Sequence, residues 1–120
     1  MLITSDLITE KAKHFAIRII KLYQHLTEKK KEFILSKQVL RSGTSIGANR
    51  TEAVYAFSGK DFLHKNEIAL GECAETLYWL ELLNIAGYIT TKQFTSISAD
   101  CEEILKLLTA SVKSLKGKTR

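Results

Sequence analysis

The sequence predicts an all-α protein, an antiparallel up-down-up-down four-helix bundle. The chain of 120 residues has no proline and only six glycines, and leucine, isoleucine, alanine, lysine and glutamate dominate it, which favours helices. Apolar residues recur at intervals of three and four through four segments, as in helices that bury one face. Because the connections are short, consecutive helices are expected to pack antiparallel. At this length, residues 1–120 are expected to form one domain.

The first predicted helix runs from about residue 5 to residue 27. Its apolar stripe alternates intervals of four and three residues and consists of Ile8, Ala12, Phe15, Ile19, Leu22 and Leu26. The lysine-rich sequence TEKKKEF, residues 27–33, then interrupts the stripe and predicts a polar connection.

The second predicted helix covers residues 33–57. Its stripe consists of Val39, Gly43, Ile46, Arg50, Ala53 and Phe57. The middle, LRSGTSIGANRTEA, has the composition of a phosphate-binding loop, but that loop requires GxxxxGK[ST] after a strand. Here only three residues separate Gly43 from Gly47, Ala48 stands where the lysine belongs, and no strand is predicted before them. The apolar periodicity passes straight through the glycines, which argues against a linker as well.

Gly43, Ile46 and Gly47 are therefore expected to pack this helix against a neighbour. The two glycines lie one turn apart on the apolar face, where their missing side chains let another helix approach closely. Each internal glycine costs about 1 kcal/mol relative to alanine, so a gain in contact area is expected in return. A kink at the glycines is the alternative.

A second stripe on the same helix is small or polar throughout and consists of Ser42, Ser45, Asn49 and Glu52. It either faces solvent or meets another helix through hydrogen bonds, within the subunit or across an interface. Arg50 falls at or beside the apolar stripe, and a buried guanidinium needs a carboxylate. Arg50 is therefore expected either to pair with a glutamate or to extend its head to the surface.

The third predicted helix covers residues 59–86. Ser58 and Asp61 have the spacing of a capping box, so the helix is expected to start there. Gly87 is well placed to adopt the left-handed conformation that ends a helix. One face of this helix consists of Phe62, Ala69, Cys73, Leu77, Leu80 and Asn84.

The last part of this helix, LYWLELLNIAG, is apolar almost all round. A bundle helix buries only one stripe in its own core, so the remaining surface needs another cover. A partner subunit is the expected cover, with Tyr78 and Trp79 as candidate interface residues. An unusually thick core within one subunit is the alternative.

The fourth predicted helix covers residues 91–115. Thr90 and Gln93 repeat the capping signature at its start. Its apolar residues have heptad spacing and are Phe94, Ile97, Cys101, Ile104, Leu108 and Leu115. Ser111 is the one polar residue in this pattern. The basic tail, residues 116–120, is expected to fray.

The net charge of +5 and the isoelectric point near 9.3 suit a polyanionic partner. The candidate nucleic-acid-binding residues are the cations of the first connection and of the starts of two helices: Lys29, Lys30, Lys31, Lys37, Arg41, Lys60 and Lys65. Such groups contact phosphates without reading bases, and the affinity they give falls with salt. A solvated basic surface is the alternative for each of them.

The sequence contains no arrangement typical of an enzyme or a metal protein. The Glu-x-x-His pair of di-iron bundles does not occur, and Cys73 and Cys101 lie far apart without a CxxC, which predicts buried, reduced thiols. We expect no catalytic residues, no cofactor, no metal and no small-molecule substrate. The N-terminus lacks the pattern of a signal peptide and no apolar run approaches membrane-spanning length, which predicts a soluble cytoplasmic protein without a membrane partner.

Several stretches carry a family resemblance: LSKQVLRSGTSIGAN with the following Glu52-Ala53, KDFLHKNEIALGE, and ETLYWLELLNIAGYI. Together, over about residues 5–115, they resemble the four-helix-bundle proteins encoded in intervening sequences of bacterial 23S rRNA genes. The resemblance implies assembly into a ring, a homopentamer, without catalytic residues or a cofactor. It also makes Ser45, Asn49 and Glu52 candidates for a subunit interface. Arg50 departs from the pattern, because relatives usually carry an aliphatic residue there.

A related group, the accessory variability determinants of diversity-generating retroelements, is similar in fold, and its members are basic pentamers that bind nucleic acid and a reverse transcriptase. For the intervening-sequence proteins, RNA binding is the usual suggestion. The leading hypothesis is a non-enzymatic homo-oligomer that binds RNA or a nucleoprotein through basic surface residues. The alternative is a protein-interaction scaffold that uses the apolar surface of the third helix and binds no nucleic acid.

Overall fold

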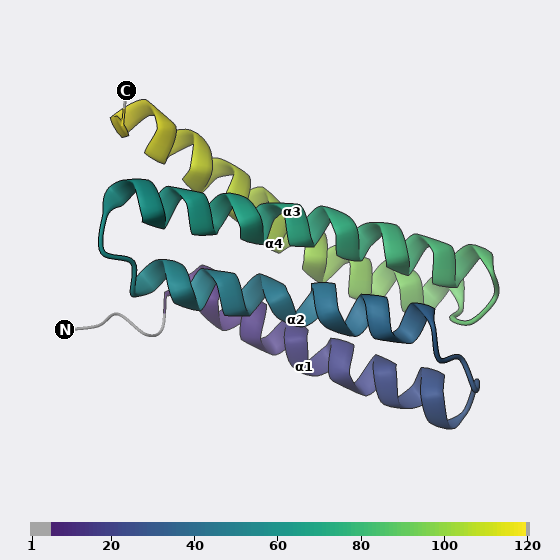
Figure 1. Ribbon diagram of the computed structural model, residues 1–120. Helices are drawn as coiled ribbons and strands as arrows, with labels where there is room; N and C mark the ends of the chain where they lie inside the picture. Colours follow the sequence, from purple (N-terminus) through teal and green to yellow (C-terminus); the bar gives the residue numbers. More distant parts are fainter. Residues whose placement is uncertain (1–5, 120) are drawn as a thin grey trace.

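Four α-helices make up the regular structure of the chain in the computed structural model, which describes residues 6–119, without the side chains of residues 118 and 119. The helices are α1 (Leu7–Glu28), α2 (Leu35–Val54), α3 (Gly59–Ile85) and α4 (Thr91–Thr119). They form a bundle that measures 47 × 24 × 21 Å along its principal axes, and α4 lies along α3 (Figure 1). Residues 6–119 contain no strand, and the all-α four-helix prediction is confirmed.

The helices α1 and α2 run in opposite directions, as two pairs of facing residues show. Gly43 of α2 faces Ile19 of α1, whereas Gly47, one turn later, faces Ala12. Two connections, residues 29–34 and 86–90, therefore share one end of the bundle, called the two-loop end below (Figure 1). The connection formed by residues 55–58 lies at the opposite, one-loop end.

Side-chain caps fix the starts of α1, α3 and α4. The Asp6 carboxylate accepts hydrogen bonds from the backbone N–H and the hydroxyl of Thr9, at 2.9 and 2.8 Å, and so caps α1. Ser58 accepts from the Asp61 backbone N–H at 3.1 Å and caps α3. The start of α3 is confirmed, and the first helix begins at Leu7; residue 5, where we predicted its start, lies outside the described residues.

The predicted end of α3 and the predicted cap of α4 are also confirmed. Thr90 and Gln93 form a reciprocal capping box, in which each side chain accepts from the other's backbone N–H, at 3.1 and 2.8 Å. Gly87 has a φ of 85°, the left-handed conformation that ends α3.

The predicted limits of α2 are too wide. The helix begins at Leu35 instead of residue 33, because the nearly buried Glu32 carboxylate accepts from the backbone N–H groups of Ile34, Leu35 and Ser36 at 3.1, 2.9 and 2.7 Å. It ends at Val54, so Phe57 lies beyond the helix and is fully exposed instead of continuing the apolar stripe.

The helix α4 is longer than predicted, and fraying of the basic tail stays a prediction. The helix α4 continues to Thr119 instead of ending at residue 115, and residue 120 lies outside the described residues. The basic sequence of residues 116–119 therefore lies on α4, at the end of this helix that is far from the two-loop end (Figure 1).

The core is a continuous apolar column between the four helices. Its largest fully buried members come from all four and include Phe15, Ile19, Leu26, Ile46, Leu80, Leu83, Ile104 and Leu108. The helix α2 runs unbroken through its glycines, and a Cβ at Gly43 would lie only 2.8 Å from Cγ1 of Ile19. The α1–α2 approach at this point is thus too close for any side chain on α2.

Candidate nucleic-acid interface

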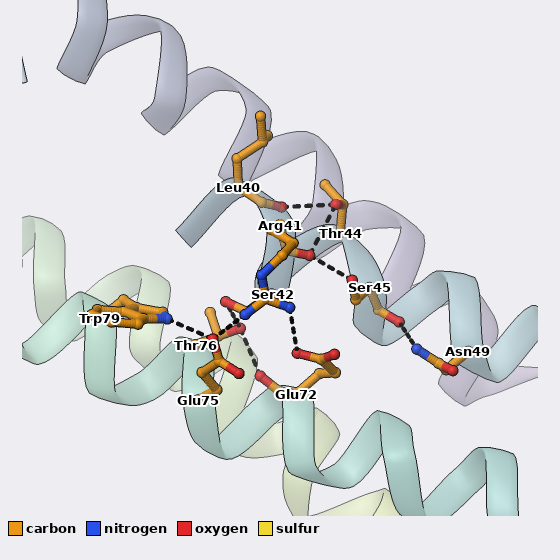
Figure 2. Close-up of polar contacts among 10 residues, drawn as sticks. All are labelled: Leu40, Arg41, Ser42, Thr44, Ser45, Asn49, Glu72, Glu75, Thr76 and Trp79. Atoms are coloured by element: carbon orange, nitrogen blue, oxygen red, sulfur yellow. Dashed lines mark hydrogen bonds and ion pairs between the residues drawn. The ribbon is translucent and has the colours of Figure 1, made fainter. Parts of the chain in front are cut away.

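The α2–α3 face carries a polar network around Arg41 (Figure 2). The guanidinium of Arg41 reaches from α2 to two glutamates one turn apart on α3: Nη1 lies 3.5 Å from Oε1 of Glu72, and Nη2 bonds Oε2 of Glu75. Glu75 also accepts from the Trp79 indole N–H at 2.9 Å. Two carboxylates therefore neutralise Arg41, which weakens it as a phosphate-binding residue.

The small polar stripe of α2 is divided between inside and outside. Ser42 is fully buried, with its hydroxyl oxygen 2.9 Å from the Thr76 hydroxyl of α3. Thr76 Oγ1 also lies 2.7 Å from the Glu72 carbonyl, and because a hydroxyl has one proton, Thr76 donates to that carbonyl while Ser42 donates to Thr76. Ser42 therefore forms a hydrogen bond with another helix, as one of the alternatives predicted, and this helix belongs to the same subunit.

The other three residues of the stripe form hydrogen bonds with other groups of the same chain. The Ser45 hydroxyl donates to the Arg41 carbonyl at 2.6 Å, and the Asn49 amide donates to the Ser45 carbonyl at 2.9 Å (Figure 2). Glu52 is exposed and accepts from the Lys65 ammonium at 2.7 Å. A subunit interface at Ser45, Asn49 and Glu52 stays a prediction.

The aromatic pair on α3 differs in exposure. Tyr78 is 53% exposed, and its ring meets Trp79 edge-on with the ring centroids 5.2 Å apart. Trp79 is half-buried and packs against the core. Further along the helix, Ile85 is 75% exposed, so α3 presents apolar surface outside the core of its own subunit.

Apart from Arg41, the candidate cations fall into two separate groups. Lys29, Lys30, Lys31 and Lys37 lie at the two-loop end, are exposed, and make no ion pair with a described residue. Lys31 has a φ of 54°, a left-handed conformation that turns the chain from α1 toward α2.

The other two candidates lie near the one-loop end. Lys60 is exposed in the first turn of α3, and Lys65 is paired with Glu52, whose hydrogen bond and charge raise the pKa of the lysine. Since α3 starts at the end opposite Lys29, the structure does not bring all the candidates onto one surface.

A groove between α1 and α4 at the two-loop end was not found from the sequence. It opens into a hollow of about 440 Å³ whose lining includes Arg18, Lys21, Leu22, His25, Lys92 and Ile97. A second hollow of about 410 Å³ shares His25 with the first and extends to Lys30 and Tyr88. Arg18, Lys21 and His25 follow three- and four-residue spacing on α1, which was the available signal.

Arg50 is held inside the bundle near the one-loop end. It is only 8% exposed; Nη1 donates to the Asn66 amide oxygen at 2.6 Å, and Nη2 donates to the Asp6 carboxylate at 3.3 Å. The guanidinium also lies 5.6 Å from the centroid of the Phe62 ring. The expectation of a glutamate partner or a surface position is therefore wrong, because an aspartate supplies the carboxylate.

The pKa of Asp6 reflects its two roles. Burial acts to raise it, but the hydrogen bonds from Thr9 and the charge of Arg50 outweigh burial and lower the pKa of Asp6. The same carboxylate thus caps α1 and connects the start of α1 to α2.

Both cysteines are buried in the core as free thiols. The Cys101 thiol lies 3.5 Å from the Cys73 carbonyl oxygen, and the hydrogen bond with Cys73 together with burial raises the pKa of Cys101. A thiol held in this protonated form is a weak nucleophile.

The described residues include no group of three or more His, Cys, Asp or Glu side chains that could hold a metal ion. In residues 6–119, no helix has the length and apolar character needed to cross a membrane.

The fold and these surfaces define a small, basic four-helix-bundle protein with a group of exposed lysines at its two-loop end. The chain matches the family described as 23S rRNA-intervening sequence protein over residues 6–110, and it belongs to that family. The resemblance seen in the sequence is therefore confirmed.

Comparison with solved structures supports the same assignment. The chain is 52% identical to a protein with unknown function from the S23 ribosomal protein family of Bacteroides thetaiotaomicron. The match covers 89% of this chain and 99% of that one, with a TM-score of 0.88. No curated protein matches the sequence.

Proposed function

We propose that this protein is a non-enzymatic, cytoplasmic homo-oligomer that binds RNA, free or within a nucleoprotein, through the basic residues of its two-loop end. One observation carries the proposal: Lys29, Lys30, Lys31 and Lys37 gather there without an ion pair to a described residue, whereas Arg41 and Lys65 are held by glutamates. Unpaired surface cations can neutralise phosphates without first breaking an ion pair. The proposal needs no cofactor and no small-molecule substrate.

Oligomerisation is supported by large apolar side chains that the single chain leaves exposed. Phe57 is fully exposed, and Ile34 and Ile85 are each 75% exposed. Burying such side chains against another copy removes apolar area from water, at about 25 cal/mol per Å². The homopentamer implied by the family resemblance would display five copies of the lysine cluster, so that contacts that are weak in one subunit add up on one RNA.

The RNA proposal is tested by fluorescence anisotropy of a labelled structured RNA across a salt series. The variant Lys29→Ala/Lys30→Ala/Lys31→Ala is compared with a control that loses the same charge elsewhere, Lys13→Ala/Lys106→Ala/Lys113→Ala. Each lost phosphate contact lowers the slope of log K against log [salt] by about 0.7 to 0.9, so the cluster variant is expected to lose about 2 from the slope. No RNA binding by the wild type at low salt, or equal effects of both variants, would refute the proposal.

The assembly is tested by light scattering at micromolar protein concentration. A particle mass several times that of the 13.5 kDa chain is expected, and five times that mass for the pentamer. A stable monomer would refute the homo-oligomer.

A protein-interaction scaffold is the second candidate, favoured by the exposure of Tyr78 and Ile85 on α3. In that case the apolar side of α3 binds a different protein and the lysines only solvate the surface. Anisotropy separates the candidates, because a scaffold gives no salt-dependent RNA binding.

A further inference from the structure

We infer that the α1–α4 groove at the two-loop end is a binding site for single-stranded RNA, in which a nucleotide enters the hollow and Lys21 and Lys92 contact its flanking phosphates. The inference rests on the proposed function and names the site. Its first support is the charge of the lining. Among the described residues that line the two adjoining hollows, four are cationic, Arg18, Lys21, Lys30 and Lys92, and none is acidic.

The cations of the groove differ in availability. Arg18 is fixed in place: its Nη1 lies 2.8 Å from the Asp100 carboxylate, and its Nη2 donates to the Ser96 hydroxyl at 3.1 Å. Lys21 and Lys92 stand exposed on facing helices and make no ion pair with a described residue. A phosphate chain that crosses the groove therefore meets two free ammonium groups, one on each side.

The floor of the hollow is apolar, which selects against a bare inorganic anion. Leu22 of α1 lines it together with Ile89 and Ile97, which are buried, whereas the lysines are exposed. The second hollow adds the Tyr88 side chain, an aromatic surface of the kind on which bases stack. A ligand with phosphates at its rim and an apolar base or ribose at its centre fits this lining.

The part of the α1–α4 groove that lies toward the one-loop end has an acidic lining. There, a hollow of about 460 Å³ is lined by Glu10, Asp100 and Glu103 together with Lys11 and His14. The two parts are of similar size and lie between the same helices, yet their charges differ in sign. A polyanion in the basic part is thus repelled from the acidic part and directed toward Lys30 and the connection of residues 29–34.

Shape favours a single strand over a duplex. An A-form duplex presents its phosphates on a convex surface and keeps its bases stacked inside, so it cannot place a base against a recessed floor. A single strand can turn a base into the hollow while its phosphates follow the rim. The N-terminus of α4, capped by Thr90, lies at the same place and adds the positive end of a helix dipole.

The inference is tested by anisotropy with a labelled single-stranded RNA of about twelve nucleotides, within the range of known single-strand sites. The groove variant Lys21→Glu/Lys92→Glu is compared with Lys13→Glu/Lys106→Glu, which makes the same charge change on the same two helices outside the basic groove. Circular dichroism verifies that both variants fold. The groove variant is expected to bind at least about tenfold more weakly than the control at about 100 mM salt.

Each outcome decides between the inference and the proposed function. Equal binding by the two variants overturns the groove site while the proposed function stands. Binding of a stem-loop but not of the single strand does the same, and so does displacement of the strand by an equimolar mononucleotide, which would make the hollow a nucleotide pocket. Failure of the wild type to bind either RNA at low salt overturns both.

Discussion

Gly43→Ala is expected to destabilise the bundle at the place where α1 and α2 approach each other. The new Cβ would lie 2.8 Å from Cγ1 and 2.9 Å from Cγ2 of Ile19, two branch atoms of a fully buried side chain that cannot both rotate away. Overpacking a core costs about 1 to 3 kcal/mol, and we take about 3 here because both branches clash. Replacing a helical glycine by alanine recovers about 1, which leaves a net loss of about 2 kcal/mol.

Gly47→Ala is the matched control, one turn along the same helix. Its Cβ would lie 3.5 Å from the Ala12 Cβ, an ordinary contact, so the helical gain of about 1 kcal/mol is retained and the two variants are expected to differ by about 3. Urea unfolding followed by circular dichroism, at one protein concentration, measures the free energies of unfolding. In Gly43→Ala/Ile19→Ala, the loss should be smaller than the sum of the single losses. A Gly43→Ala protein as stable as the wild type would show that α1 and α2 leave room for a side chain at this position.

Three further predictions concern polar groups. The hydrogen bonds from residues 34–36 lower the pKa of Glu32 against the effect of burial, so its stabilisation is present above the unfolded pKa and is lost as the pH falls through the lower folded value. Between pH 5 and 3, wild type should lose more stability than Glu32→Gln in urea titrations; parallel losses would contradict this. Arg50→Ala should cost about 1 to 3 kcal/mol in thermal unfolding, because it leaves the buried Asn66 oxygen unpaired, and a neutral effect would argue against this hydrogen bond. Thr76→Val should cost about 1 to 3 kcal/mol by stranding the Ser42 hydroxyl, and Ser42→Ala/Thr76→Val should regain part of it; a double variant less stable than the single one would be inconsistent.

The helices could be predicted because their signals are local. The capping pairs at Ser58 and Thr90 and the left-handed Gly87 act within one turn of their own positions, and each appears where its spacing indicated. The start of α2 was less predictable. Its cap is the carboxylate of Glu32, a long side chain that reaches forward over a connection, and the sequence pattern does not distinguish it from a surface glutamate.

The groove and the neutralised cations could not be predicted, because they depend on which helices face each other. Arg41 meets glutamates 31 and 34 residues away, so its exposed position one turn from Lys37 gave no sign of its pairing. Lys21 and Lys92 approach only when α1 and α4 are neighbours. Helical spacing gives the face of one helix, whereas the partner of that face is a property of the whole bundle.

Photocrosslinking reports directly whether RNA binds the two-loop end. A single-stranded RNA that carries 4-thiouridine is irradiated with the wild-type protein, and the crosslinked peptides are sequenced by mass spectrometry. We predict crosslinks to residues 18–31 of α1 and its connection and to residues 88–97 at the start of α4. Crosslinks confined to the one-loop end or to the α2–α3 face, with none in those two segments, would contradict RNA binding at the two-loop end.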